Sequence, residues 1–392
     1  MAFVLGFLAA MGPLCIDLYL PALPHMTEQL GSSASQMQLS ITFNLLGLAL
    51  GQVIIGPLSD AHGRKLPLLI SLLLFIVTSF LCAVSQHIEQ FLFLRFLQGL
   101  AGSGGVVLAR TIACDMFRGT ELTRFFSLLM LINSAAPIFG PVIGGQIMRI
   151  SGWTSIFFLL CACGIAQFTL VARGCPETLP SERRSSGGIS ASLRKMKNLL
   201  GNRAYMCYLL VQGFIMAGFF GYVAASPFVL QKIYGLSAQQ YSLSFAANGI
   251  GIMIAAQITG RICAVYGDRA ILRFGACISL ASAACVAVVC ILHLAVSWLL
   301  VFLGLFVSCM GIISTTSFSL AIASQKEGAG SASGLLGVAS FVFGSVTSPL
   351  VGILGDMSAM PMACVAVLSS ALVLFFYVAA GTVPANEHRN TR

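Results

Sequence analysis

Long apolar stretches follow one another along this sequence, with only short polar breaks between them. A helix needs about 20 predominantly apolar residues to cross a bilayer. The chain is 58% hydrophobic and only 8% charged, whereas soluble domains carry about 25% charged residues. We therefore predict an all-α membrane protein with twelve transmembrane helices. The expected spans are residues 2–24, 39–58, 66–85, 91–113, 124–148, 153–172, 204–230, 240–262, 270–291, 296–322, 331–354 and 361–381.

Lysine and arginine are distributed unevenly over the breaks between these spans. Seventeen of the 21 lie in the breaks and the C-terminal tail of one side, two (Arg149 and Lys232) lie on the other side, and two lie within a span. Because cytoplasmic loops carry an excess of Lys and Arg, we expect both termini in the cytoplasm and a multi-pass location in a bacterial inner membrane. This bias also explains the net charge of +9, so no nucleic-acid partner is expected.

The longest break, residues 173–203, divides the chain into two halves of similar length. Residues 1–172 are predicted to form an N-terminal six-helix half, residues 173–203 a cytoplasmic linker, and residues 204–392 a C-terminal six-helix half with a short cytoplasmic tail. GPLSDAHGRK after the second span has the counterpart GRICAVYGDR after the eighth, and PVIGG in the fifth span has PLVGI in the eleventh. Paired halves with a substrate site between them are typical of secondary transporters.

The sequence offers little for catalysis, metal binding or nucleotide hydrolysis. The 13 cysteines include no CxxC pair, the five histidines are scattered, and no P-loop pattern occurs. We therefore expect no enzyme, no metal and no cofactor, and a membrane-embedded enzyme or a receptor is disfavoured. Because no Lys or Arg precedes Arg64, the first apolar run is interpreted as a transmembrane helix and not as a signal peptide.

Five short motifs carry a family resemblance. They are IDLYLPALP (16–24), GPLSDAHGRK (56–65), RFLQG (95–99), APIFGPVIGG (136–145) and CPETLP (175–180). With them, the whole chain resembles a major facilitator superfamily transporter, and within that superfamily the bicyclomycin-resistance type of multidrug exporter. The resemblance implies a twelve-helix fold, alternating access, and exchange of protons for a small-molecule substrate. The expected partners are that substrate, protons and the lipid bilayer, and a monomer is expected.

The motif GPLSDAHGRK supplies a candidate gate on the cytoplasmic side. Gly56 allows close helix approach and Gly63 a tight turn. Arg64 and Lys65 anchor the turn in the cytoplasm, and Asp60 lies at a helix end, where it can pair with a cation. The resemblance implies that these five residues form a latch. The alternative is a turn that only carries the positive charge of the cytoplasmic side.

The motif APIFGPVIGG places two prolines and three glycines in one predicted span. Gly140 and Gly144 form a GxxxG pattern that permits close helix packing, and Pro141 removes a backbone donor and bends the helix. The resemblance identifies Pro137, Gly140, Pro141, Gly144 and Gly145 with an antiporter motif, which implies leak-tight central helices and export. Packing of small residues alone is the alternative.

Asp17 is the only charged residue between Met1 and Pro24. An ionisable residue in a membrane helix costs about 2.5–3.5 kcal/mol, so it is functional by default. Pro21 and Pro24 cannot donate to the carbonyls of residues 17 and 20, and such carbonyls are tolerated only against protein or a wet cavity. Because burial opposes ionisation of a carboxylate, we predict that Asp17 carries the transported proton. A permanent salt bridge to an arginine is the alternative.

Two arginines lie within the predicted fourth span. The resemblance makes Arg95 an interior partner in proton transfer, although a side chain near the span end can also snorkel to the headgroups. At the other end of this span, Arg110 and Asp115 resemble a family element and are expected to form an ion pair with each other.

The substrate cavity is predicted from polar and aromatic residues of the cavity-forming spans. These are Tyr19, Asn44, Gln52, Phe228, Tyr241 and Asn248. A single interior acid among few fixed polar groups favours loosely specific binding of small, mostly apolar drugs or toxic compounds. A proton-coupled carrier of a metabolite, such as an amino acid or a nucleoside, is the alternative on the same fold.

Overall fold

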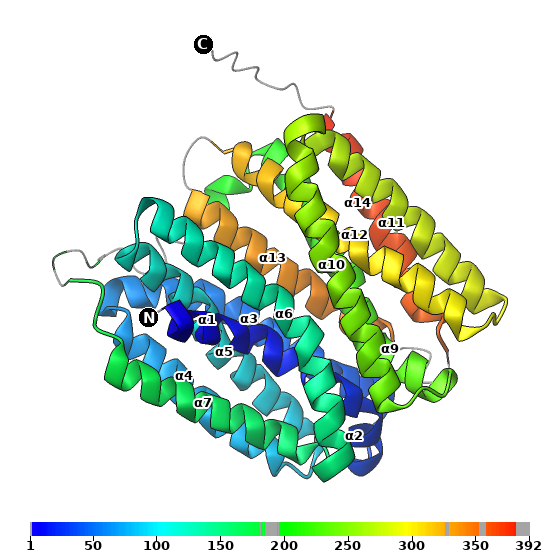
Figure 1. Cartoon of the computed structure of the whole chain (residues 1–392), viewed down its shortest axis with the longest axis horizontal. Coiled ribbons are helices and arrows are strands. Elements are labelled where there is room, and N and C mark those ends of the chain that lie inside the picture. The colour runs from blue at the N-terminus through cyan, green and yellow to red at the C-terminus, as the bar shows by residue number, and fades with distance from the viewer. Residues whose placement is uncertain are drawn as a thin grey trace.

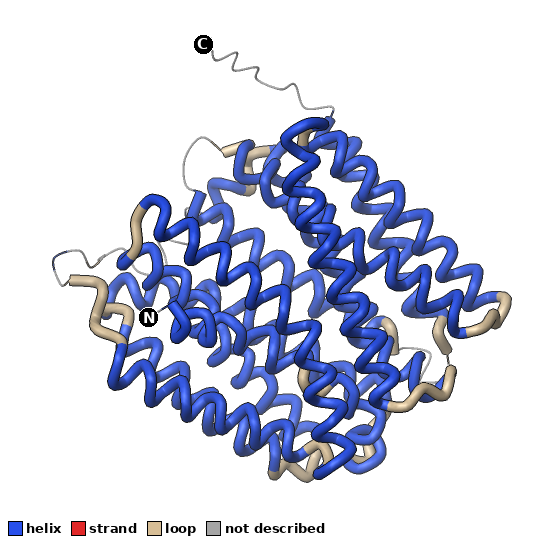
Figure 2. Tube along the Cα trace, in the orientation of Figure 1, coloured by secondary structure: helices blue, strands red, loops and turns tan. Residues whose placement is uncertain are grey.

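The computed structural model describes residues 2–180, 182, 184, 194, 196–325, 329–352 and 358–381. These residues form helices and loops, and no strand occurs among them (Figure 2). The elements are α1 (Ala2–Asp17), η1 (Leu20–Ala22), α2 (Leu23–Gln29), α3 (Ala34–His62), α4 (Lys65–Ala83), α5 (Ile88–Met116), α6 (Gly119–Ser151), α7 (Thr154–Gly174), α9 (Arg203–Phe228), η3 (Val229–Ile233), α10 (Ala238–Tyr266), α11 (Asp268–Ile291), α12 (Val296–Ala323), α13 (Ala329–Leu350) and α14 (Met360–Gly381).

The prediction of an all-α membrane protein is confirmed. Within the described residues, 11 helical stretches are long and apolar enough to cross a membrane. The predicted span 124–148 lies inside α6, a helix of 33 residues. Each of the twelve predicted spans therefore falls on helical segments as far as the structure describes it, which for the span 331–354 is up to residue 352. Residues 185–193 of the predicted linker and 382–392 of the predicted tail lie outside the described residues.

The first span is not one continuous helix. It consists of α1, the 3₁₀ turn η1 and the short helix α2. Pro21 and Pro24 explain the break, because neither has an N–H to continue the α-helical bonding. The first helix of the second half ends in a comparable way, since Pro227 lies near the end of α9 and the π-helix η3 follows.

The helices form two groups. Helices α1–α7 contact one another, as do α9–α14, and the two groups meet mainly where α3 packs on α13 and α6 packs on α10 (Figure 1). The helix α1 begins, and α3, α5 and α10 end, on one side of the bundle, which is called here the N-terminal face. The helix α2 and the connection between η3 and α10 lie on the opposite face (Figure 1).

Helices α3 and α10, in which the sequence predicts counterparts, have matching end structures. Each has 29 residues and starts with a capping box, formed by Ser33 and Gln36 in α3 and by Ser237 and Gln240 in α10. Such a box satisfies backbone donors that the first helical turn leaves free. Each helix is followed by a glycine with positive φ, Gly63 at 91° and Gly267 at 79°. Both helices therefore begin with a capping box and end before a glycine with positive φ.

Candidate functional site

Asp17 is the last residue of α1 and lies at the helix break. Its exposed fraction is only 6%. In the described part of the chain, the ion pairs are Arg64 with Asp60, Arg64 with Asp115, and Lys232 with Glu28. The expected alternative of a permanent salt bridge therefore finds no partner among the described residues, and Asp17 is a buried carboxylate without a neighbouring cation there.

The motif APIFGPVIGG of α6 packs directly on this break. A Cβ added at Gly140 would lie 2.9 Å from Cβ of Asp17, and one added at Gly144 would overlap the carbonyl oxygen of Leu18. The neighbouring Gly145 faces Ser242 of α10 in the same way. Helix α6 can approach the break this closely because Gly140 and Gly144 have no side chains. The structure thus brings together two motifs that the sequence predicts separately.

A second part of the motif faces the other half. A Cβ added at Gly249 of α10 would lie 3.5 Å from the carbonyl carbon of Pro137. Pro141 is buried and Pro137 half-buried within α6. The motif therefore forms the contact between α1 and α10, the first helix of one half and the second helix of the other.

Tyrosines of the second half lie near Asp17. Tyr222 and Tyr241 are both within electrostatic range of its carboxylate. Nδ2 of Asn248 donates to the Tyr222 hydroxyl at 2.8 Å, and the Tyr241 hydroxyl lies 3.4 Å from Oγ of Ser226. These uncharged, hydrogen-bonded groups are called here the polar wall.

The sequence prediction includes Tyr241 and Asn248 but misses Tyr222. A tyrosine inside an apolar span needs a hydrogen-bond partner for its hydroxyl, and this was the available signal. Tyr222 also stacks on Phe245 with ring centroids 5.6 Å apart, so the wall combines hydrogen-bonding groups with an aromatic surface.

The other residues of the predicted cavity lie elsewhere. Tyr19 and Asn44 are fully buried inside the first half, where the Tyr19 hydroxyl lies 2.9 Å from Oγ of Ser40 and Asn44 donates to the carbonyl of Arg95 at 3.1 Å. Phe228 is part of the hydrophobic core. Gln52 contacts the backbone of α13, since a Cβ at Gly337 would lie 2.7 Å from its side-chain oxygen. Only Tyr241 and Asn248 of the six are grouped with Asp17.

Arg95 is completely buried, so it does not snorkel to the headgroups. Its guanidinium lies 4.4 Å from the centroid of the Tyr19 ring and 5.8 Å from that of Phe157, at distances typical of cation–π contacts. Nη1 donates to the side-chain oxygen of Gln98, while Nε and Nη2 have no hydrogen-bond partner in the described structure. Tyr19, two residues after Asp17, is the link between this arginine and the break in α1.

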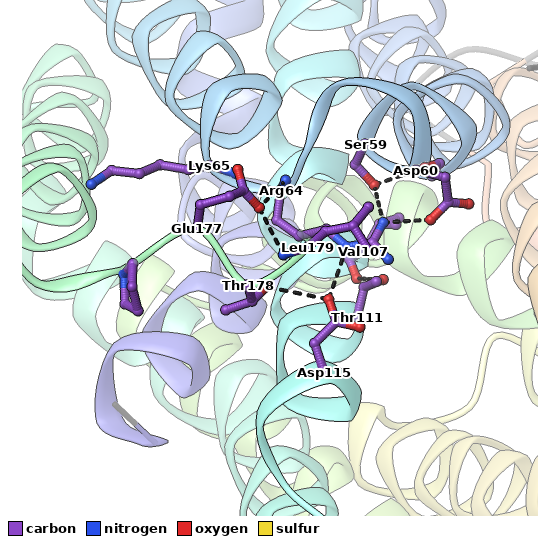
Figure 3. A network of polar contacts seen from close by, with 12 residues as sticks. Ser59, Asp60, Arg64, Lys65, Val107, Thr111, Asp115, Glu177, Thr178 and Leu179 are labelled. Atoms are coloured by element: carbon purple, nitrogen blue, oxygen red, sulfur yellow. Dashed lines mark hydrogen bonds and ion pairs between the residues drawn. The ribbon is translucent and has the colours of Figure 1, made fainter. Parts of the chain in front are cut away.

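The motif GPLSDAHGRK forms a charged network on the N-terminal face (Figure 3). Nε of Arg64 donates to Asp115 at 2.9 Å, and Nη1 donates to Ser59 at 2.8 Å and to Asp60 at 2.5 Å. The predicted pair of Arg110 with Asp115 is therefore wrong. Asp115 lies beside the turn between α3 and α4, whereas the Arg110 side chain is exposed.

Glu177 completes this network, and the sequence prediction misses its role. Its carboxylate oxygens accept from the backbone N–H of Arg64 at 2.8 Å and of Lys65 at 3.1 Å (Figure 3). A Cβ added at Gly63 would lie 2.5 Å from an oxygen of this carboxylate, so a side chain at this position would collide with Glu177. Burial raises the pKa of Glu177, but the backbone N–H donors outweigh it and hold the pKa below its ordinary value. The available signal was an acidic residue just after a membrane span, which can cap a helix N-terminus.

Thr178 and Lys65 attach the same segment further. Oγ1 of Thr178 donates to Asp115 at 3.2 Å, and Nζ of Lys65 donates to the carbonyl of Ala172 at 3.1 Å. The latch is defined from here on as Ser59, Asp60, Arg64, Asp115, Glu177 and Thr178. All of these residues belong to the first half.

The chemistry available at Asp17 is the binding and release of a proton. The residue lies at a helix break, within electrostatic range of Tyr222 and Tyr241, and α6 packs on it at Gly140. The described residues contain no group of three or more His, Cys, Asp or Glu side chains that could hold a metal ion.

Comparison with known proteins agrees with this architecture. The sequence model of the Major Facilitator Superfamily matches residues 3–349. An uncharacterized MFS-type transporter of Bacillus subtilis, YdgK, is 41% identical over 93% of this chain and 91% of its own length. A bicyclomycin resistance protein homolog of Haemophilus influenzae is 28% identical over 95% of this chain and 94% of its own.

Solved structures agree at the level of the fold. A D-xylose-proton symporter superposes with a TM-score of 0.75 over 95% of this chain and 97% of its own, at 14% identity. The matched family model covers most of the sequence, and the helices, the broken first span and the buried acid fit a transporter. The chain is therefore a multi-pass membrane transporter that belongs to the Major Facilitator Superfamily.

Proposed function

We propose that this transporter exports small, mostly apolar drugs or toxic compounds in exchange for protons across a bacterial inner membrane. The observation that carries the proposal is Asp17, a buried carboxylate without a cation beside it in the described structure. It lies at a helix break whose 3₁₀ turn, η1, contacts α9 and α10 of the other half. A buried carboxylate is strongly disfavoured in its charged form unless a partner compensates it. Binding a proton is therefore the natural way to neutralise it.

The exchange follows from this balance. With a proton on Asp17, the site is neutral and the halves can close around it. Substrate that enters against Tyr222, Tyr241 and Asn248 changes the surroundings of the carboxyl group and favours release of the proton. Each proton that moves down a membrane potential supplies about 2.3 kcal/mol per 100 mV, which drives substrate in the opposite direction.

Two observations support a drug over a metabolite as substrate. The polar wall has neutral hydrogen-bonding groups and the stacked rings of Tyr222 and Phe245, with few fixed charges to recognise an amino acid. The relative from Haemophilus influenzae carries the name bicyclomycin resistance protein homolog. Both favour a neutral, partly apolar compound.

The test uses purified protein in liposomes with an imposed proton gradient. We expect uphill uptake of bicyclomycin by the wild type, and no uptake of an amino acid or a nucleoside. Asp17→Asn keeps the size and hydrogen-bonding capacity of the side chain but cannot titrate. It should abolish uphill uptake and substrate-induced proton release while downhill exchange continues.

Glu89→Gln is the matched control, because Glu89 is an exposed carboxylate in the first turn of α5. It should leave proton release unchanged. Undiminished proton release from Asp17→Asn would show that the coupling site lies elsewhere. Uphill uptake of an amino acid or a nucleoside would favour the metabolite carrier.

The orientation in the membrane has its own test. Reporter fusions after Ser186 and Gln86 should report opposite sides, with Ser186 in the cytoplasm.

A further inference from the structure

Four hydrogen bonds and one ion pair join the two halves near the opposite face. Gln38 donates to the carbonyl of Ala224 at 3.3 Å, and Thr42 to that of Ser345 at 3.1 Å. In return, Gln231 donates to the carbonyl of Pro21 and Gln239 to that of Gly145, both at 3.3 Å. Lys232 pairs with Glu28 at 3.0 Å. These ten residues are referred to as the gate.

The gate residues share a position in their helices. In the first half they lie around α2, in the first turns of α3, and near the end of α6. In the second half they lie at the end of α9, in η3, at the start of α10, and near the end of α13. All of these segments meet at the opposite face (Figure 1). Each half supplies two side-chain donors and two backbone acceptors, so the closure is reciprocal.

The carbonyl of Ser345 is available because of a proline. In a continuous helix it would accept the N–H of the residue four positions later, but that residue is Pro349, which has no N–H. Thr42 of the other half supplies the missing donor. Ser345 and Thr42 are both buried, at 2% and 8% exposure, so this bond is closed off from solvent.

The carbonyl of Pro21 is available for a related reason. In the 3₁₀ turn η1, Leu23 donates to the carbonyl of Leu20. The next donor in this pattern would be Pro24, which again has no N–H. Gln231 of η3 takes its place. A turn that breaks the first helix of one half is thus bonded to the irregular end of the first helix of the other half.

Gln239 provides a contrast within the gate. Its acceptor is Gly145, which lies four residues before Arg149 in a helical part of α6. That carbonyl keeps a partner in the helix when the halves separate, whereas the carbonyls of Ser345 and Pro21 depend on the other half or on water.

From these contacts we infer that prolines at the helix ends build two of the four gate hydrogen bonds, by freeing the carbonyls of Ser345 and Pro21 to accept from the opposite half. When the gate is closed, a freed carbonyl is buried and needs the side-chain donor. When the gate opens, water replaces that donor and no helix bond is broken. The prolines therefore make the closed state depend on individual side chains of the other half, while the open state costs the helices nothing. This inference rests on membership of the transporter family and is independent of the substrate.

Thr42→Val is the central variant, because it keeps the shape of the side chain and removes the donor. It leaves the Ser345 carbonyl buried without a partner in the closed state, which is the more costly way to lose a hydrogen bond. We expect the ratio of open to closed gate to rise about tenfold. Gln239→Met should raise it by about twofold, since the carbonyl of Gly145 remains bonded in α6.

Pro349→Ala supplies the rescue. It restores an N–H that can donate to Ser345 within α13, so the double variant Thr42→Val/Pro349→Ala should return the ratio close to that of Pro349→Ala alone. Thr42→Ser retains a hydroxyl donor and should behave like the wild type. This variant also controls for misfolding at position 42.

The measurement is hydrogen–deuterium exchange of the full chain in lipid nanodiscs without substrate, followed in peptides from residues 34–45 and 340–352. An open gate accelerates exchange in both peptides. The inference would be overturned if Thr42→Val and Gln239→Met raised the ratio of open to closed gate equally. It would also be overturned if this ratio were clearly higher in the double variant than in Pro349→Ala alone. Because no substrate or proton gradient is used, neither outcome depends on whether the protein exports drugs.

Discussion

On the N-terminal face, the latch places a guanidinium between two carboxylates of one half, whereas on the opposite face the gate joins both halves through mostly neutral hydrogen bonds. Removing one partner of a buried ion pair costs about 3–5 kcal/mol, while a neutral hydrogen bond contributes about 0.5–1.5 kcal/mol. The strong contacts of the latch lie within one half, so they can remain intact while the two halves move. The weaker contacts lie where the halves must separate.

The largest effect is expected for Arg64→Met. The Arg64 side chain is 7% exposed and lies between Asp60 and Asp115, so its loss leaves Asp115 partly buried without its cation. We expect the free energy of unfolding to fall by about 3 kcal/mol. This loss should appear as a lower melting temperature of the protein in detergent. Arg110→Met is the control and should have little effect. A stable Arg64→Met protein would remove the distinction between a strong latch and a weak gate.

Adjacent glycines of α6 separate contacts within a half from contacts between halves. Gly144→Ala drives a methyl group into the backbone of Leu18, which cannot rotate away, so it should destabilise the protein by about 1–3 kcal/mol. Gly145→Ala meets the side-chain oxygen of Ser242, which can turn aside. It should leave stability nearly unchanged and instead increase hydrogen exchange at the gate. The two effects are compared by thermal melts and exchange on the same preparations, and the reverse pattern would contradict this division.

Glu177→Gln weakens the latch without removing its arginine. Replacing this cap of the turn before α4 should cost about 1 kcal/mol at neutral pH. Because the folded pKa of Glu177 is lowered from the ordinary 4.5, its contribution is present above that pH and is lost as the pH falls through the folded pKa. The melting temperatures of wild type and variant should therefore differ at pH 7 and converge as the pH falls below 4.5 and through the folded pKa of Glu177. A difference that persists at low pH would show that the charge of Glu177 is irrelevant.

The smallest effect is expected for the ion pair of the gate. The Glu28 side chain is 66% exposed, and exposed pairs contribute about 0–1 kcal/mol. Glu28→Gln should leave the melting temperature unchanged and raise the ratio of open to closed gate by less than threefold. At 1 M salt the ion pair is screened, so wild type and Glu28→Gln should then show the same ratio. An effect larger than that of Thr42→Val would make the gate as electrostatic as the latch.

The spans could be predicted because hydropathy is a local property of about 20 residues. The break in the first span was equally local, since Pro21 and Pro24 leave carbonyls free wherever the chain goes. The carbonyl of residue 20 was predicted to be free, but it accepts from Leu23, and the carbonyl left free is that of Pro21. The sequence did not indicate what that carbonyl contacts. The donor to Pro21 is Gln231 of the other half, and only the tertiary fold brings the two together.

The candidate site shows the same limit. Pairing Asp115 with Arg110 followed from proximity in sequence, whereas the true partner, Arg64, lies 51 residues away. Glu177 acts on backbone N–H groups 113 and 112 residues earlier, and backbone groups have no signature in the sequence. Asp17 could be singled out as a candidate because a carboxylate in an apolar span is conspicuous on its own, and its role in proton coupling stays a prediction.

The composition of the latch also bears on how the chain is made. Its residues lie between Ser59 and Thr178, so every one of them has been synthesised before the ribosome reaches α9. Chains are translated from the N-terminus and domains generally fold in that order. The last residues needed, Glu177 and Thr178, follow directly after α7. The first six helices can consequently be fastened together while the remaining helices still await insertion, and the later helices then assemble against a partner that is already formed.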